Sequence, residues 1–282
     1  MNNSATIKLF LPQGDAKRLR VGEVSNWTGK ALAAPRTELD ELLQREELNN
    51  AGVYFLFGES PDTGNALAYI GEAEVIRERL KQHKAKDFWN AVVVFVSKDE
   101  NLTKAHIRYL ESRLIDEAGE IGRYKLENQK LNKPKLPESD REDMEVFLSR
   151  IRQVLPVLGS DLLTPITSGN KNASLEPALE CKVKDALAKG RRTTTGFVVY
   201  QNSTAVADAR SSAQNHHGYV LQMRNKLLDE GALIKQSNLL FFVKDVEFAS
   251  PSAAASVVHG GGANGLTAWK DSSGKTLKQL ED

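Results

Sequence analysis

Three residues with the chemistry of a phosphate site lie between positions 79 and 111 of the chain. Arg79 and His83 are four residues apart, so on a helix they project from the same side. Arginine gives planar, permanently charged donors to phosphate oxygens, and histidine can exchange a proton near neutral pH. Glu111 falls on an apolar stripe of helical spacing, where a carboxylate is costly unless a cation or hydrogen-bond donors meet it. The residues alone leave two interpretations of Glu111 equally open, a structural salt bridge and a metal ligand or catalytic carboxylate.

The segment around Arg79 is basic. Residues 77–86 hold one acid, Glu78, and four cations besides Arg79 that are candidate contacts to a nucleic-acid backbone: Arg77, Lys81, Lys84 and Lys86. A solvated helix face has the same composition, so the charge pattern by itself does not choose between a phosphate-binding face and an ordinary surface.

A hairpin must precede this basic segment. Residues 51–58 are β-branched and aromatic between glycines, which predicts a strand, and residues 66–71 predict a second strand after turn chemistry at 59–65. The two strands carry Tyr54 and Tyr69, and aromatic pairs on neighbouring strands usually stabilise a sheet. A structural role is therefore the default for both tyrosines.

Two helices then carry the candidate charges. Glu72 and Glu74 are expected in the first turn of a helix that runs to about Lys84, because negative charge there suits the helix dipole. A second helix is expected over residues 98–119, and Glu111 lies on it with Gly119 at its end. Its apolar stripe consists of Ile107, Leu110, Leu114 and Ala118.

Other elements complete the N-terminal half. Residues 90–97 predict a strand buried on both faces, and residues 139–155 predict an amphipathic helix. Residues 1–48 are expected to form an extended lead-in that packs on this domain, with a short strand at 7–12 and a helix at 39–48.

The order of these features resembles the GIY-YIG nuclease family. The resemblance covers residues 51 to about 130 and joins four elements: a strand with GVY, a strand with YIG, an arginine eight residues beyond the YIG glycine, and the glutamate of YLESRLI. Either tripeptide alone would carry no weight. The resemblance implies a small mixed or antiparallel three-stranded sheet flanked by helices, within the α/β (α+β) class.

The resemblance also assigns roles. Tyr54 and Tyr69 match the two motif tyrosines, and Arg79 matches the arginine that contacts the scissile phosphate. His83 matches a histidine near the attacking water. Glu111 matches the carboxylate that binds one Mg²⁺ or Mn²⁺ ion, and Asn128 matches an asparagine that closes the site. Tyr54 is the candidate general base, and because an ordinary tyrosine pKa is about 10 it needs help from a cation or from His83. Glu72 departs from the pattern, since many members have a lysine or a small polar residue there.

We therefore expect a Mg²⁺-dependent endonuclease that hydrolyses phosphodiester bonds of nucleic acid, most simply DNA. The alternative is a module that binds nucleic acid without cutting it, in which Glu111 is a salt-bridge partner. A third hypothesis is a protein–protein adaptor whose basic helix is merely solvated. The sequence does not give the oligomeric state.

The amino-acid composition changes in the C-terminal half of the chain. Residues 159–193 are expected to be a linker because their first part is rich in Gly, Ser, Asn and Pro, and residues 194–282 a second small α+β domain, after a nuclease domain at 49–158. The stretch SPSAAAS with NGLTAW (250–269) resembles restriction- and methylase-associated domains of unknown function proposed to read modified DNA. A tight core with a glycine turn explains the same residues without DNA. His216 and His217 are expected at the surface or in a cap.

The composition of the chain bears on the cellular compartment in which the protein is expected. The chain has 282 residues, a net charge of +1, a single cysteine (Cys181) and no apolar run that approaches the roughly 18 residues of a membrane span. No disulfide can form within the chain, and the first residues do not resemble a signal peptide. We expect a cytoplasmic protein whose basic charge is local, with no membrane partner.

Overall fold

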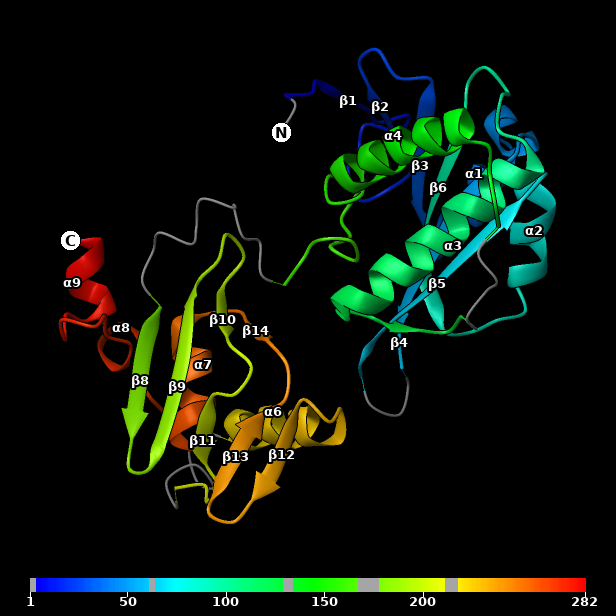
Figure 1. Ribbon diagram of the computed structural model, residues 1–282. Helices are drawn as coiled ribbons and strands as arrows, with labels where there is room; N and C mark the ends of the chain where they lie inside the picture. The colour runs from blue at the N-terminus through cyan, green and yellow to red at the C-terminus, as the bar shows by residue number, and fades with distance from the viewer. Residues whose placement is uncertain (1–3, 61–63, 129–133, 167–177, 211–217) are drawn as a thin grey trace. The chain divides into compact units, whose positions relative to one another are not determined.

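The computed structural model describes residues 4–60, 64–128, 134–166, 178–210 and 218–282. The chain forms two compact units, Met1–Thr164 and Pro165–Asp282 (Figure 1). Both units combine helices with mainly antiparallel strands, which confirms the α+β class. The expected surface histidines at 216 and 217 lie outside the described residues.

Within the described residues, the N-terminal unit is built on a seven-stranded sheet. Its order is β1 (Ile7–Phe10), β2 (Arg20–Val24), β3 (Gly29–Pro35), β6 (Trp89–Ser97), β4 (Gly52–Glu59), β5 (Ala66–Ala73) and β7 (Lys125–Leu126). All neighbours are antiparallel except β5 and β7. The predicted strands β6, β4 and β5 lie side by side, but the expected number of three strands is wrong. The lead-in supplies β2 and β3, and β3 gives the buried strand β6 its second partner.

Helices cover both faces of this sheet (Figure 1). One apolar core joins it to α3 (Lys104–Ile121) and α4 (Glu138–Val154), and the other joins it to α1 (Leu39–Leu43) and α2 (Ile76–His83). Side chains alternate along β4, so Phe55 belongs to the first core and Tyr54 to the second. Tyr54 therefore faces the helix that carries Arg79 and His83.

The hairpin continues further than expected. Strand β5 pairs with β4 as far as Ala73, which lies opposite Gly52, and α2 begins only at Ile76. Glu72 is thus a strand residue and Glu74 precedes the helix, so their placement in the first helical turn is wrong. The strand ladder satisfies backbone groups that a helix start would leave free.

Two helices end at other residues in the structure than the sequence predicts. Thr103 caps α3 through a capping box with His106, and the helix continues past Gly119 to end at Gly122, whose φ of 69° is the left-handed conformation that favours glycine. The helix expected at 39–48 is interrupted, because α1 is followed by a 3₁₀ turn at Glu46–Asn49 with an extended Arg45 before it.

In the described residues, the C-terminal unit has two sheets around one core. The first has the order β14 (Val246–Phe248), β10 (Phe197–Val199), β9 (Ala186–Arg192) and β8 (Leu179–Val183); the second has β11 (Thr204–Val206), β13 (Leu239–Phe242) and β12 (Leu233–Gln236). The helices are α6 (Gly218–Asp229), α7 (Pro251–His259), α8 (Gly265–Ala268) and α9 (Leu277–Glu281). Buried side chains from both sheets and α7 share one cluster.

Both predicted boundaries of the linker at 159–193 are wrong. Leu162 and Leu163 are buried in the core of the N-terminal unit, and residues 179–192 form β8 and β9. The middle of that range, 167–177, lies outside the described residues. The inward side chains of β9 are Ala186, Ala188 and Gly190, whose small size gives a weak strand signal in the sequence.

Candidate active site

Tyr54 is the centre of a polar cluster between β4 and α2. Its side chain is fully buried, and its hydroxyl lies 2.8 Å from Nε2 of His83. Nε of Arg79 donates to the same oxygen at 3.3 Å. Arg79 and His83 are one turn apart on α2, so the helix presents both to a single hydroxyl. The structure thus brings these three predicted site residues together.

Gly71 allows the Tyr54 ring to reach this position. A Cβ atom built on Gly71 would lie 2.3 Å from the Tyr54 hydroxyl oxygen and 2.4 Å from Cζ. The phenol therefore lies directly against the backbone of β5, in space that any larger side chain at 71 would occupy. The glycine of YIG is required by close packing.

Tyr69 lies on the neighbouring strand and joins the same aromatic group. Its ring centroid is 6.1 Å from that of Tyr54 and 5.1 Å from that of His83. Nζ of Lys86 lies 4.5 Å from the Tyr69 ring centroid, within the range of a cation–π contact. Tyr69 is half-buried, so its ring lines the cluster while part of it stays accessible.

Glu111 approaches the end of β5 from α3. Burial, together with the negative charge of Glu72, raises the pKa of Glu111 to about 7. A hydrogen bond from the Glu72 backbone and the positive charges of Arg108 and Arg79 act in the opposite direction. These interactions place Glu72, Glu111 and Arg79 in one electrostatic group although they come from β5, α3 and α2. Glu72 itself is half-buried, and burial raises its pKa as well.

Asn128 binds the free edge of β5. Its Oδ1 accepts a hydrogen bond from the Ile70 N–H at 2.9 Å, and its Nδ2 donates to the Ile70 carbonyl at 2.6 Å. The amide side chain therefore continues the pairing of β5 beyond β7, where Glu127 N–H donates to Ala68. Asn128 lies next to the strand segment that carries Tyr69 and Gly71, but both ends of its amide are engaged by the backbone.

Protonation within the buried cluster has clear directions. Burial raises the pKa of Tyr54, opposed by the Arg79 charge. Burial, with Lys86 and Arg79, lowers the pKa of His83 to about 4, so the imidazole is neutral at neutral pH. Nδ1 of His83 is buried without a hydrogen-bond partner among the described residues. Neutral Nε2 can therefore accept the Tyr54 proton.

The four predicted backbone contacts have different environments. Half-buried Arg77 donates to the Arg45 carbonyl at 2.9 Å, so one of its donors is already engaged by the backbone. The lysines are exposed, with Lys81 paired to Glu78 at 2.8 Å, Lys84 to Asp40 at 2.5 Å, and Lys86 over Tyr69. Exposed ion pairs of this kind are weak and exchange readily with another anion.

Two arginines were not anticipated by the sequence. Arg36 donates to the carbonyls of Lys84 at 2.9 Å, Lys86 at 2.5 Å and Trp89 at 3.2 Å, and its guanidinium carbon lies 4.5 Å from the Trp89 ring centroid. It thus fixes the chain just after α2. Arg108 precedes Glu111 by three residues on α3 and is exposed. Its position one turn before a buried carboxylate is the signal that could have found it.

A divalent cation would find one well-placed carboxylate here. Among the described residues there is no group of three or more His, Cys, Asp or Glu side chains that could hold a metal ion. Glu111 is half-buried on α3, and the charge of Glu72 acts on it from β5. This donor set suits Mg²⁺ that keeps several waters and completes its shell with substrate oxygens.

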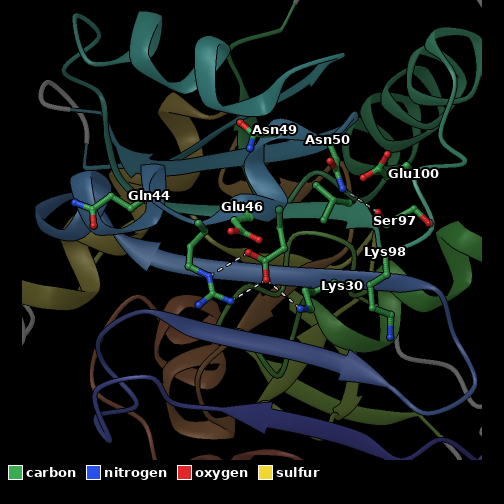
Figure 2. Close-up of a pocket in the computed structure, with 11 residues that line it drawn as sticks. Lys30, Gln44, Glu46, Asn49, Asn50, Ser97, Lys98 and Glu100 are labelled. Atoms are coloured by element: carbon green, nitrogen blue, oxygen red, sulfur yellow. Dashed lines mark hydrogen bonds and ion pairs between the residues drawn. The ribbon is translucent and has the colours of Figure 1, made fainter.

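A separate pocket of about 850 Å³ lies in the N-terminal unit (Figure 2). It is lined by residues of β3, the end of β6 and the segment 44–50, and includes none of the Tyr54 cluster. Its cations are already paired: Glu47 lies 3.0 Å from Lys30 and 2.7 Å from Arg45. The cations that line this pocket are therefore already engaged by acidic side chains.

The SPSAAAS stretch of the C-terminal unit is explained by packing. Ser250 caps α7, the Ser252 hydroxyl accepts the Gly265 N–H at 2.9 Å, and buried Ser256 accepts the Ala263 N–H at 3.1 Å. Trp269 is fully buried and donates to the Pro251 carbonyl at 3.0 Å. These four residues therefore hold the unit together, whereas Asn264 and Thr267 of the same stretch are exposed.

Comparison with known proteins addresses the C-terminal unit. Residues 179–281 match the family described as a domain of unknown function, DUF4357. No curated protein and no solved structure matched the chain. Across the described residues, the helices are too short or too polar to cross a membrane. The C-terminal unit thus resembles a family whose function is not defined, as the sequence had indicated.

Proposed function

We propose that the N-terminal unit is a metal-dependent endonuclease of the GIY-YIG type that hydrolyses phosphodiester bonds of nucleic acid, with DNA as the first substrate to test. One observation carries the proposal: Tyr54, Arg79 and His83 share a hydroxyl-centred cluster, and Glu111 approaches the same end of β5. No GIY-YIG family matched the chain, so support comes from these residues and their geometry alone.

The residues divide the chemistry of hydrolysis. The guanidinium of Arg79 offsets the negative charge that develops on the phosphate oxygens. Tyr54 takes the proton of the attacking water while it passes its own proton to Nε2 of neutral His83. In this relay the water loses a proton and Nε2 of His83 gains one, so Tyr54 is not left as a free phenolate. Tyr69 and Gly71 hold the Tyr54 ring in place.

Glu111 is the residue that would hold a single Mg²⁺ or Mn²⁺ ion, with Glu72 beside it. When bound, such an ion supplies positive charge for the departing oxyanion. Glu72 stands where the family pattern has a lysine or a small polar residue, and its negative charge adds to the attraction of a cation. Asn128 contributes by fixing the edge of β5 that faces Glu111.

Plasmid nicking tests the proposal. The purified chain is incubated with supercoiled plasmid and Mg²⁺ or Mn²⁺, beside Arg79→Ala, Glu111→Ala and the matched control Arg141→Ala, an exposed arginine on α4. We expect metal-dependent nicking by the parent and the control, and losses of roughly 100-fold or more in the two site variants. If Arg79→Ala and Glu111→Ala both cut as well as the parent, the assignment of these two residues to the active site is wrong.

The buried state of Tyr54 favours a second candidate. A fully buried phenol with a raised pKa also suits a module that binds nucleic acid without cutting it. A panel of duplex, flap, branched and methylated substrates separates the two candidates, because the second predicts retained complexes and no product with any metal.

The C-terminal unit would direct the nuclease to its substrate. This part of the proposal rests on its presence in the same chain and on the resemblance of its SPSAAAS region to restriction- and methylase-associated domains. Since Ser250, Ser252, Ser256 and Trp269 are engaged in packing and hydrogen bonds, recognition would fall to other residues of the unit. A cytoplasmic setting is proposed from the single cysteine, Cys181, which is a buried free thiol.

A further inference from the structure

Arg108 is an exposed arginine beside the two carboxylates of the candidate site. It precedes Glu111 by three residues on α3, so the two side chains are neighbours on one helix surface. Burial raises the pKa of Glu111 and of Glu72, and the positive charge of Arg108 opposes that rise in both. Arg79 acts on the same two carboxylates from α2. Two arginines on different helices therefore approach one pair of acids.

In the part of the chain that the structure describes, the donors of Arg108 have no protein partner. Among the described residues it has no hydrogen bond and no ion pair within 4 Å, although it lies near Glu111 and Glu72. The other cations of the helix differ: Lys104 pairs with Glu74 at 2.7 Å, and Arg113 with Glu145 at 2.7 Å. A guanidinium with five free N–H groups matches the geometry of a phosphate.

We infer that Arg108 is a second phosphate contact, which binds the nucleic-acid backbone beside the phosphate that Arg79 holds. The inference rests on the proposed function, because it takes the substrate to be a phosphodiester chain placed at Glu111. A nucleic-acid strand presents phosphates in sequence, so contacts from α2 and α3 on either side of Glu111 would fix its path across the site. Arg108 would thus position the substrate and leave the chemistry to the Tyr54 cluster.

Salt-dependent binding tests this role. Fluorescence anisotropy with a labelled duplex DNA oligonucleotide is recorded over a series of salt concentrations, with Mg²⁺ present and with Glu111→Gln in every chain to prevent turnover. Arg108→Ala is compared with Arg141→Ala, which removes the same charge from α4. We expect Arg108→Ala to reduce the slope of log affinity against log salt by about 0.9, the value for one lost contact, and Arg141→Ala to leave it unchanged.

Several outcomes overturn the inference. They are an unchanged slope and affinity in Arg108→Ala, an equal effect of Arg141→Ala, and an absence of salt-dependent binding by the parent. Cleavage kinetics separate this inference from the proposed function: with Glu111 restored, Arg108→Ala should raise KM and keep kcat. If the parent binds with the expected slope difference but never cuts, the nuclease proposal fails and the backbone contact remains.

Discussion

The hydroxyl of Tyr54 lies 2.8 Å from Nε2 of His83, and both side chains are buried. His83 would gain a charge only at low pH, because burial lowers its pKa to about 4. The hydroxyl is thus placed between a permanent cation, Arg79, and a neutral base. In the proposed reaction, this one oxygen would take the proton of the attacking water and pass its own proton to Nε2 of His83.

Tyr54→Phe should abolish the relay while it preserves the ring. We expect nicking to fall by about 100- to 10,000-fold, as is typical for loss of a general base. The free energy of unfolding should fall by about 1–3 kcal/mol, because Nε2 of His83 loses its partner in a buried site. The matched control is Tyr109→Phe on α3, which removes a hydroxyl that donates to Glu145 at 2.8 Å. This control variant should keep its nicking activity. Equal nicking by both variants would contradict the relay.

Gly71→Ala tests the close contact between β5 and Tyr54. The new methyl would overlap the phenol, so we expect a stability loss of about 1–3 kcal/mol and a displaced hydroxyl with much reduced nicking. Gly119→Ala is the control: its Cβ would meet nothing nearer than Leu126 Cδ1 at 3.9 Å. In a helix this change should stabilise by about 0.5–1 kcal/mol. Urea denaturation and nicking are measured on both, and a stable, active Gly71→Ala chain would contradict the packing argument.

The local features of the N-terminal unit were predictable from sequence. The hairpin, the apolar stripe of α3 and the four-residue spacing of Arg79 and His83 all follow from short-range periodicity. The prediction of Glu111 as a site residue came from a carboxylate on an apolar stripe, and the structure places Glu111 half-buried near Glu72. Each of these signals lies within a few residues of the feature that it predicts.

Long-range pairing accounts for what was missed. Strand β3 has several alanines, which give little strand signal, and its place in the sheet comes from pairing with β6, more than fifty residues away. The side chain of Asn128 bonds to the backbone of Ile70. The Arg36 guanidinium donates to backbone carbonyls that follow α2, and we call these contacts the Arg36 clamp. No local pattern identifies a backbone group as the partner of a distant side chain.

The raised pKa of Glu111 gives a pH-dependent stability. A carboxyl whose folded pKa is above its unfolded value favours folding fully below about pH 4.5, and this contribution is lost as pH rises through about 7. In the absence of divalent metal, Glu111→Gln should therefore raise the free energy of unfolding by about 1–3 kcal/mol at pH 8 and change it little at pH 4.5. Urea denaturation at the two pH values measures the difference. Glu120→Gln, an exposed acid on the same helix, should show no such pH dependence, and the same shift in both variants would contradict the assignment to Glu111.

Arg36→Ala tests whether the lead-in fixes the candidate site. The variant leaves three carbonyls after α2 without their donor and removes the contact over Trp89, so we expect a loss of about 2–4 kcal/mol in the free energy of unfolding. Amide hydrogen exchange should accelerate at residues 76–89 more than in α4, because the clamp acts on the end of α2. Arg36→Lys keeps the charge but lacks the fork that reaches several carbonyls, so it should recover only part of the stability. The exposed Lys17→Ala serves as the control and should leave exchange in α2 unchanged. If Arg36→Ala exchanged like this control across 76–89, the clamp would not be what holds Arg79 and His83 against Tyr54.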